Sequence, residues 1–210
     1  MKNILIIGAH YDDAELGAGG TAAKLVAEGK RVYKLTLTDN TTQFVQRNIN
    51  VSKDDSISDS AKACRVLGVE EIPFEPLVCN ELIYTKQTMQ RVEAILFEKQ
   101  IDTVFMHYDE DMNYDHVTAS RICMTAARHC DNILTYQSNV YQLSRIFQPQ
   151  FFVDISAYIE KKREALAQYG AEHNRYNKLF QTNIERNHIW GYSNEVEYAE
   201  GFGVIKYLER

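Results

Sequence analysis

Short apolar runs alternate with longer amphipathic segments over the first two thirds of this 210-residue chain, and this alternation limits the fold more than any other feature. The apolar runs have the length and composition of buried strands and fall at residues 3–8, 31–37, 102–106 and 132–136. The amphipathic segments have helical spacing and fall at residues 15–28, 55–67, 86–99 and 116–129. Strands joined through helices predict an α/β fold with a mainly parallel sheet, helices on both faces, and functional loops at the carboxyl ends of the strands.

Two segments depart from this alternation. Residues 38–54 are polar, and we predict a long loop there, of the kind that often covers or lines a binding site. After Pro149, the sequence "FFVDI" predicts a further strand, and a charged helical pattern follows from about Ala157 to Arg186. The chain length predicts one domain over residues 1–210, in which the part from about residue 150 is a candidate for a smaller C-terminal subdomain.

The charge balance and the apolar runs argue against several classes of partner. With 23 basic and 29 acidic side chains the formal net charge is −6, and no basic run stands out, so we expect no nucleic acid or anionic membrane surface as main partner. No stretch approaches the roughly 18 apolar residues of a membrane span. The N-terminal apolar run is too short for a signal peptide. We therefore expect a cytoplasmic protein whose four cysteines are reduced thiols.

The first predicted strand ends in a turn that is crowded with acidic side chains, "GAHYDDAELGAGG" at residues 8–20. One interpretation is structural, because Asp12 and Glu15 have the spacing of a helix capping box. Acidic side chains also stabilise the N-terminus of a helix by about 0.3–1 kcal/mol. Helix capping is therefore the first interpretation of this turn.

Nucleotide binding is a second interpretation. Gly17, Gly19 and Ala22 match the pattern G-x-G-x-x-A, and Asp39 ends the second strand where a ribose-binding acid would lie. However, the glycines follow the strand too late, and the acidic side chains occupy the place of the pyrophosphate. Like charges there would cost several kcal/mol without a cation.

A metal ion is a third interpretation, and a second acidic turn supports it. His10 and Asp13 end the first strand, and histidine nitrogen and carboxylate oxygen are good zinc ligands. The strand at 102–106 leads into "MHYDEDMNYDHVTAS", which contains His107 and His116. The same segment carries the acidic residues Asp109, Glu110, Asp111 and Asp115. Parallel strands place their carboxyl ends at one edge of a sheet, so the two turns can meet there, and their combined negative charge favours a cation.

Several segments resemble those of one enzyme family. "AHYDDAELGAGGTAAKL" is similar to the A-H-P-D-D-x-E-L-x-x-G-G-T motif of the LmbE/PIG-L family of metal-dependent N-deacetylases, and "DMNYDH" resembles that family's D-x-[HN]-x-D-H signature. "VEYAEGFGV" at residues 196–204 resembles its C-terminal A-E-x-F, and "ACRVLGV" at 63–69 fits its second helix. The resemblance spans nearly the whole chain and implies a Rossmann-like α/β fold with a zinc site.

Carried over residue by residue, the resemblance implies that His10, Asp13 and His116 bind zinc and that Asp12 is the general base. Zinc lowers the pKa of a bound water towards about 7 and polarises a carbonyl. The implied reaction is removal of an N-acyl group, typically N-acetyl, from an amino sugar, its glycoside or its nucleotide conjugate. The implied partners are this small-molecule substrate and, as a homo-oligomer, further copies of the chain.

Two positions depart from the family pattern. Tyr11 replaces the usual proline, and Asn113 stands where many members have a second histidine that acts as acid or stabilises the transition state. We therefore consider Asn113, Tyr114 and His107 as groups that stabilise the oxyanion, and we prefer His107 because it ends the strand. The alternative for His107 is a histidine packed at the strand end.

The remaining assignments concern the surroundings of the ligands. We expect Asp115 to orient the ring of His116 or to cap the next helix, and Asp39 to support the ligands from the end of the second strand. We expect Gly19 and Gly20 to let the first helix pack closely on the sheet. The residues expected to contact substrate are Tyr11, Asn40, Arg47 and Tyr114.

Three other functions are compatible with the same residues. An N-deformylase needs the same attack by water. A non-haem iron oxygenase needs two histidines and one carboxylate, which His10, Asp12 and His116 provide, although enzymes that use H-x-D commonly have all-β folds. A binding module for a sugar or nucleotide would use the acids only as helix caps. Metal analysis separates these functions, because zinc favours a hydrolase, iron an oxygenase, and no stoichiometric metal a binding module.

Overall fold

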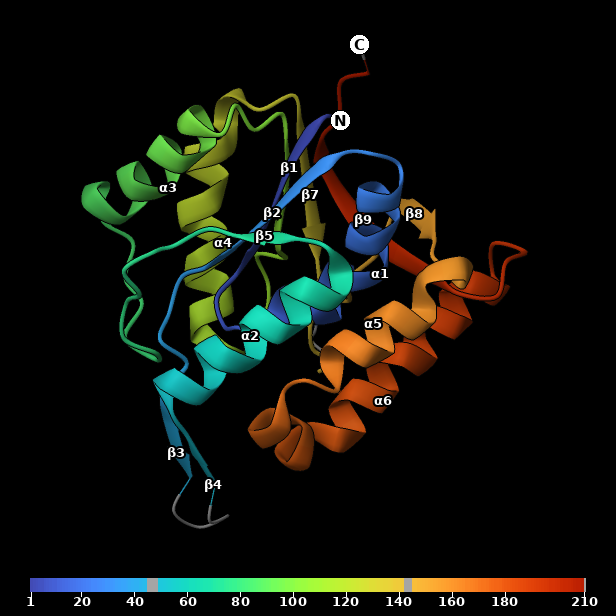
Figure 1. The fold of residues 1–210 in the computed structure, drawn as a ribbon. Coiled ribbons are helices and arrows are strands. Elements are labelled where there is room, and N and C mark those ends of the chain that lie inside the picture. The colour runs from blue at the N-terminus through green and yellow to red at the C-terminus, as the bar shows by residue number, and fades with distance from the viewer. Residues whose placement is uncertain (45–48, 142–144, 210) are drawn as a thin grey trace.

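One mixed β-sheet organises the residues that the structure, a computed structural model, describes: 1–44, 49–141 and 145–209. Its strands are β1 (Asn3–Gly8), β2 (Arg31–Thr36), β5 (Glu70–Glu71), β6 (Thr103–His107), β7 (Asn132–Tyr136), β8 (Phe151–Asp154) and β9 (Ala199–Lys206). They lie in the order β5-β2-β1-β6-β7-β9-β8 (Figure 1). β1, β2, β5, β6 and β7 run parallel, and β9 pairs antiparallel with both β7 and β8.

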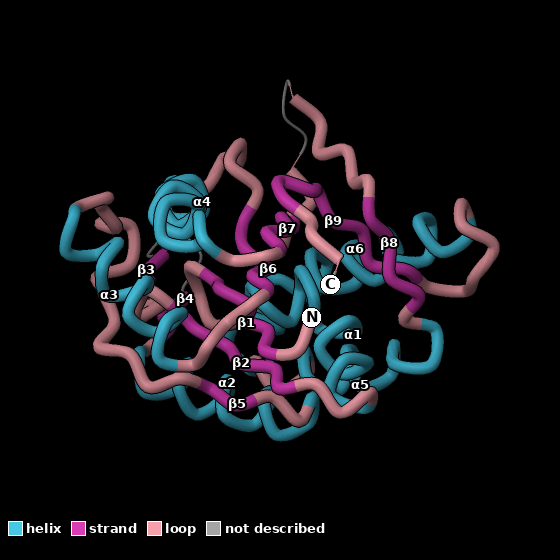
Figure 2. Tube along the Cα trace, turned by 90° about the horizontal axis from the view of Figure 1, so that it is seen from above, coloured by secondary structure: helices cyan, strands magenta, loops and turns pink. Residues whose placement is uncertain are grey.

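Six α-helices in the described residues cover the two faces of the sheet. They are α1 (Asp13–Ala27), α2 (Lys53–Leu67), α3 (Lys86–Glu98), α4 (Tyr114–Ala126), α5 (Ile159–Leu166) and α6 (Gly170–Tyr192). α3 and α4 pack on one face, whereas α1, α2, α5 and α6 lie on the other (Figure 2). The mainly parallel α/β fold with helices on both faces is therefore confirmed.

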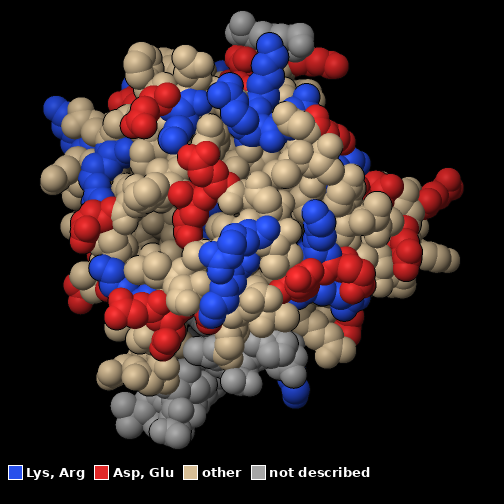
Figure 3. Space-filling model, viewed as in Figure 1, with Lys and Arg blue, Asp and Glu red and all other residues tan. Residues whose placement is uncertain are grey.

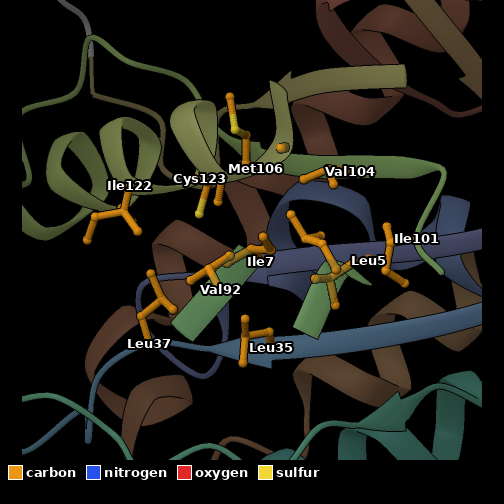
Figure 4. Close-up of a cluster of buried hydrophobic side chains, with 14 of the residues drawn as sticks. Leu5, Ile7, Leu35, Leu37, Val92, Ile101, Val104, Met106, Ile122 and Cys123 are labelled. Atoms are coloured by element: carbon orange, nitrogen blue, oxygen red, sulfur yellow. The ribbon is translucent and has the colours of Figure 1, made fainter. Parts of the chain in front are cut away.

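Strand β1 lies at the centre of the sheet and is buried on both sides. Leu5 and Ile7 face the apolar cluster beneath α3 and α4 (Figure 4), while Ile4 and Ile6 face α1. This two-sided burial explains why the strand is apolar without alternation. Burial of each such side chain contributes about 1.5–3 kcal/mol. The core therefore fixes the carboxyl end of β1, from which the acidic turn begins.

Three segments differ from the prediction, in addition to the two-residue strand β5, which was not predicted. The expected loop at 38–54 contains a hairpin of β3 (Thr42–Phe44) and β4 (Ile49–Val51). The expected long helix divides into α5 and α6 at Tyr169, whose φ of −83° and ψ of 81° are not helical and whose side chain is fully buried. Strand β9 was not predicted, because glycines interrupt its apolar residues. Glycine is needed where β9 meets β7, since a Cβ on Gly203 would lie 2.4 Å from Thr135 Oγ1.

Helix α1 is broken at Ala18, whose φ of −146° and ψ of 20° are not helical. The break leaves backbone groups without helical partners, and distant side chains supply these partners. Lys162 Nζ donates to the carbonyl oxygen of Leu16 at 2.8 Å. Glu200 accepts hydrogen bonds from the N–H groups of residues 20 and 21 at 3.0 and 2.7 Å. The second part of α1 is thus capped by a carboxylate of β9.

The glycines of α1 allow close packing. A Cβ on Gly17 would lie 2.1 Å from the ring of Tyr136, and one on Gly20 would lie 2.7 Å from Ile155, which follows β8. Gly19 is less restricted, because its nearest contact, the side chain of Lys162, is at 3.4 Å. Close packing is therefore confirmed at Gly20 and is tightest at Gly17. The ring of Tyr136 fills the space beside Gly17, which argues against the phosphate contact that the nucleotide interpretation needs there.

The surface and the thiols agree with the composition. Basic and acidic side chains are interspersed over the face of the molecule that Figure 3 shows. All four cysteines are free thiols, as predicted, and each is buried. Among the described residues, none of the helices has both the length and the apolar character needed to cross a membrane.

Candidate active site

A cavity opens at the carboxyl edge of the sheet, where the turns after β1, β6 and β7 meet. Both predicted turns contribute to it, because His10, Asp12 and Asp13 follow β1 and His116 belongs to the segment after β6. The lining residues are His10, Asp12, Asp13, Leu16, Asn40, Thr42, Cys79, Asn80, Asn113, His116, Ser138, Asn139, Tyr141 and Leu179. The topology thus brings together side chains that lie more than one hundred positions apart in the sequence.

Three side chains converge in the way that a metal ion requires. His10 Nδ1 lies 3.1 Å from His116 Nε2 and 3.3 Å from Asp13 Oδ2, and His116 Nε2 lies 3.3 Å from Asp13 Oδ1. A tetrahedral zinc ion with ligand bonds of about 2.0–2.1 Å places neighbouring ligand atoms roughly 3.3 Å apart. The three predicted ligands therefore fit a zinc ion.

The outer ring nitrogens of both histidines face carboxylates. His10 Nε2 lies 3.2 Å from Asp115 Oδ2, and His116 Nδ1 lies 3.1 Å from Asp111 Oδ2. Such carboxylates fix the orientation of metal-binding imidazoles. Asp115 therefore contacts the ring of His10. The expectation that it orients the ring of His116 is wrong. Asp111, the first residue of the "DMNYDH" segment, contacts His116 instead, a role that was not predicted.

Asn113 caps helix α4. Its side-chain oxygen accepts hydrogen bonds from the N–H groups of Asp115 at 2.8 Å and His116 at 3.4 Å. The expectation that Asp115 caps this helix is wrong, because Asp115 turns toward His10. Asn113 also lines the cavity, so it joins the start of α4 to the site.

His107 lies beneath the site and does not line the cavity. It is 1% exposed, and its ring stacks on that of His116 with centroids 4.1 Å apart. The N–H of Ala9 donates to His107 Nε2 at 3.0 Å, and the same nitrogen lies 3.1 Å from Asp13 Oδ2. This position corrects the expectation that His107 contacts an oxyanion: the ring supports Asp13 from the side of the sheet.

The electrostatics of the cluster favour a cation. Burial raises the pKa of Asp13, but the charges of His116 and His107 outweigh it and hold this pKa well below its usual range. Burial lowers the pKa of His116, but Asp13 and Asp111 outweigh it and raise this pKa to about 9. Among the described residues that line the cavity there is no lysine or arginine. Protons or a metal ion must therefore balance the carboxylates.

The capping interpretation of Asp12 and Glu15 is wrong. Asp12 is the N-cap residue of α1, but its side chain makes no capping hydrogen bond. It is 8% exposed and lines the cavity. Glu15 is fully buried and pairs with Lys34 Nζ at 2.8 Å. The two acids therefore have different roles: Asp12 belongs to the site, and Glu15 forms a buried ion pair with Lys34.

The expected substrate contacts divide. Asn40 lines the cavity and donates to Ser56 Oγ at 3.0 Å. Tyr11 is buried in the apolar cluster of α1, α2, α5 and α6, so the expectation of a substrate contact is wrong. Tyr114 is 58% exposed and lies outside the cavity lining, so a contact between its side chain and substrate stays a prediction. Arg47 lies outside the described residues.

Asp39 supports a loop and not a ligand. Its Oδ1 accepts hydrogen bonds from the N–H groups of Thr41 and Cys79, both at 3.1 Å. Cys79 in turn lines the cavity beside His10. Asp39 therefore holds Cys79 in the wall of the cavity and does not, as had been expected, contact the predicted metal ligands directly.

The third turn of the site, after β7, was not predicted. Ser138, Asn139 and Tyr141 line the cavity and follow β7. The rule that identified the other two turns, polar side chains directly after a parallel strand, applies to "YQSNVY" as well. Thr42 lies in the polar loop at 38–54, which we expected to line a binding site. Asn80 and Leu179 carried no comparable signal, because neither follows a predicted strand.

Comparison with known proteins gives a consistent assignment. The model of the PIG-L family, described as GlcNAc-PI de-N-acetylase, matches residues 5–127. The uncharacterized deacetylase YaiS of Escherichia coli K12 is 28% identical over 80% of this chain and 90% of its own length. Diacetylchitobiose deacetylase of Thermococcus kodakarensis is 25% identical over 79% of this chain and 68% of its own length.

The fold itself is shared more widely than one activity. The crystal structure of GalB, a 4-carboxy-2-hydroxymuconate hydratase of Pseudomonas putida, superposes with a TM-score of 0.83 at 19% identity. The match covers 100% of this chain and 98% of that one. The fold therefore supports more than one reaction, and the function has to be argued from the site.

Proposed function

This chain belongs to the PIG-L family, and from that premise we propose that it is a zinc-dependent hydrolase that removes an N-acetyl group from an amino sugar or its glycoside. One observation carries the proposal: His10, Asp13 and His116 converge at metal-binding distances beside a cavity that Asp12 also lines. The names of both curated relatives, which are deacetylases, support amide hydrolysis.

His10, Asp13 and His116 would hold the metal ion, since their donor atoms fit its coordination and carboxylates orient both rings. When bound, zinc would supply Lewis acidity toward the acyl carbonyl and an attacking water. His107, packed beneath Asp13, would keep this carboxylate turned toward the other two ligands. The protein would therefore provide metal-binding atoms that are already in position and largely buried.

Asp12 would act as general base. Its side chain lines the cavity next to Asp13, and a carboxylate in this place would accept a proton from the attacking water. The same carboxyl group would then deliver this proton to the nitrogen of the leaving amine. Adjacent aspartates thus divide two tasks, metal binding and proton transfer.

Asn113 is our candidate for the group that donates to the developing oxyanion. Because its side-chain oxygen accepts the hydrogen bonds that cap α4, its amide nitrogen points away from those N–H groups. Asn113 lines the cavity, whereas His107 does not. An amide N–H aimed at the acyl oxygen would stabilise charge that develops only in the transition state.

The cavity is suited to an uncharged sugar. Its described lining offers the amides of Asn40 and Asn80 and the hydroxyl groups of Ser138 and Tyr141. Amides and hydroxyl groups can both donate to and accept from sugar hydroxyls. No lysine or arginine stands among these described residues to meet a phosphate, so we favour an amino sugar or glycoside over a nucleotide conjugate.

A substrate panel tests the proposal. The purified protein, zinc-loaded or chelated, is incubated with N-acetylglucosamine, N-formylglucosamine, N,N′-diacetylchitobiose and UDP-N-acetylglucosamine, and the released amine and acid are quantified. We expect metal-dependent release of acetate from the uncharged acetylated sugars, and release about 10²–10⁴-fold slower from the Asp12→Asn variant. Faster release of formate would support a deformylase instead. Absence of amine release from every compound would contradict the proposal, and tightly bound redox-active iron would favour an oxygenase.

Two further predictions concern the cellular context. We expect a cytoplasmic location, from the composition and cysteine content, and a homo-oligomer, from the family resemblance. Light scattering at micromolar concentration tests the second expectation, and a monomer would contradict it. Neither outcome changes the assignment of the site.

A further inference from the structure

The ring of His116 is held from behind by a chain of side chains that reaches into α6. Its Nε2 faces His10 and Asp13, and its Nδ1 lies 3.1 Å from Asp111 Oδ2. The orientation of this ring therefore depends on how firmly Asp111 is held. The side chain of Asp111 is only 2% exposed, so protein groups rather than bulk water must hold it.

Asn139 holds Asp111. Its amide nitrogen donates to Asp111 Oδ1 at 2.8 Å and to Oδ2 at 2.7 Å. Its side-chain oxygen accepts a hydrogen bond from the N–H of Tyr141 at 3.1 Å, which fixes which way the amide points. The N–H of Asn113 adds a further donor to Asp111 Oδ1 at 2.8 Å. Asn139 is thus the side chain that fixes both oxygens of the carboxylate behind His116.

Arg186 of α6 holds Asn139 through the backbone. Its Nη1 donates to the carbonyl oxygen of Asn139 at 2.7 Å and to Gln137 Oε1 at 3.1 Å, and its Nη2 donates to the carbonyl oxygen of Gln137 at 2.6 Å. The guanidinium also lies over the ring of Trp190, 4.8 Å from its centre. These contacts fix the turn after β7 on the helix, and with it the position of Asn139.

We propose that Asn139, held by Arg186, is a positioning residue for the metal ligand His116 and acts through Asp111. The inference rests on the proposed metal site but not on any particular substrate. Loss of the Asn139 amide would leave Asp111 without its two shortest side-chain hydrogen bonds, so the carboxylate and the His116 ring could rotate. Groups that orient metal ligands in this way typically contribute about 10–100-fold to metal affinity.

Asn183 provides a matched control. It lies on the same helix as Arg186 and donates to the carbonyl oxygen of Ser138 at 3.1 Å, next to Asn139. Its side chain therefore holds the same turn, but it contacts neither Asp111 nor His116. A purely structural role of the turn predicts equal effects of Asn183→Ala and Asn139→Ala, whereas the positioning role predicts an effect of Asn139→Ala alone.

The experiment measures metal binding without substrate. Zinc affinity is determined by competition with a chromogenic chelator, and the visible spectrum of the cobalt-substituted protein reports ligand geometry. We expect about 10–100-fold weaker zinc binding and an altered cobalt spectrum for Asn139→Ala, a smaller loss for Arg186→Gln, and values of the natural chain for Asn183→Ala. Asn139→Asp keeps the shape but removes the donor, so it should lose affinity as well and serves if the alanine variant does not fold.

Three outcomes would overturn the inference. The first is that Asn139→Ala and Asn139→Asp leave both the zinc affinity and the cobalt spectrum unchanged. The second is that Asn183→Ala loses as much zinc affinity as Asn139→Ala. The third is that the natural chain binds no zinc. If the variants behave as expected while the natural chain releases no amine from any sugar, the inference stands and the proposed function fails.

Discussion

Asp13 and Glu15 lie two positions apart at the start of α1, and the protein treats these two buried carboxylates differently. Glu15 belongs to a lysine cluster, in which Lys34 Nζ lies 2.8 and 3.0 Å from its two oxygens. Asp13 belongs to a histidine cluster, in which His10, His107 and His116 surround it. One acid has a permanent cation from the chain, and the other has groups that can release their protons to a metal.

The lysine cluster is complete. Lys34 Nζ also donates to Ser60 Oγ and Tyr169 Oη, each at 2.9 Å, and to the carbonyl oxygen of Tyr11 at 2.5 Å. Burial lowers the pKa of Lys34, but the charge of Glu15 outweighs it and raises this pKa above its usual value. The lysine therefore stays charged and closes its cluster to ligands. A lysine thus supplies Glu15 with a cation from the chain itself, whereas the histidines around Asp13 leave a place for an external cation.

The largest expected effect concerns the metal. His116→Ala should abolish stoichiometric zinc binding and activity while leaving the fold intact, because it removes one of three ligands. Zinc at 1,000 times its dissociation constant stabilises the folded state by about 4 kcal/mol, so a chelator should lower the urea midpoint of the natural chain but not of the variant. Metal analysis and urea unfolding provide the measurements. Full zinc occupancy in the variant would refute the ligand assignment.

The second effect separates the adjacent aspartates. Asp12→Asn should keep zinc but lower kcat by about 10²–10⁴-fold, because the general base is lost. Asp13→Asn should weaken zinc binding, since an amide is a poorer ligand than a carboxylate. Zinc content and kcat of both variants are measured on any substrate found. Zinc lost only in Asp12→Asn would mean that the two roles are exchanged.

The third effect tests the lysine cluster. Lys34→Met should lower the free energy of unfolding by about 3–5 kcal/mol, because Glu15 would remain as a buried charge without its partner. The double variant Lys34→Met/Glu15→Leu should recover most of this loss. Urea unfolding of both proteins gives the two values. If the single variant is as stable as the natural chain, the contrast between the two clusters is not electrostatic.

The smallest effect checks that Asp12 is not a cap. Ser52 caps α2 by accepting a hydrogen bond from the N–H of Asp55 at 3.1 Å, so Ser52→Ala should cost about 0.5–2 kcal/mol of stability. In metal-free protein, Asp12→Ala should cost less than Ser52→Ala, because its side chain makes no such bond. The same urea series measures both. Equal losses would restore the capping interpretation of Asp12.

The parts of the site that could be predicted follow directly from buried parallel strands. β1 and β6 are continuous apolar runs, so their ends, and the side chains of His10, Asp13 and His116 beyond them, could be placed at one edge of the sheet. Strand β9 escaped prediction because it alternates glycine with other residues: Gly203 fits against β7, and Gly201 fits against Pro149 and against Phe152 of β8. Its Glu200, which caps the second part of α1, was therefore missed as well.

Errors in the site came from side-chain direction, which periodicity does not determine. Asp115 and Asp111 both precede His116 in one turn, and only the folded turn shows that they serve different histidines. His107 and Tyr11 adjoin the site in sequence, but neither lines the cavity. The side chain of His107 lies beneath Asp13, and that of Tyr11 is buried in the apolar cluster of α1, α2, α5 and α6. Strand ends therefore predict where a site lies better than which neighbouring side chains enter it.

The break in α1 has a consequence for folding kinetics. The helix that begins at Asp13 is completed by Glu200, which lies 180 positions from Gly20, and by Lys162. Contacts over such distances form late, since a long segment of chain must first be ordered to close them. The turn that carries the metal ligands should therefore reach its final rigidity only after β9 has docked. In a refolding experiment, recovery of tight metal binding would report the last step of folding rather than the first.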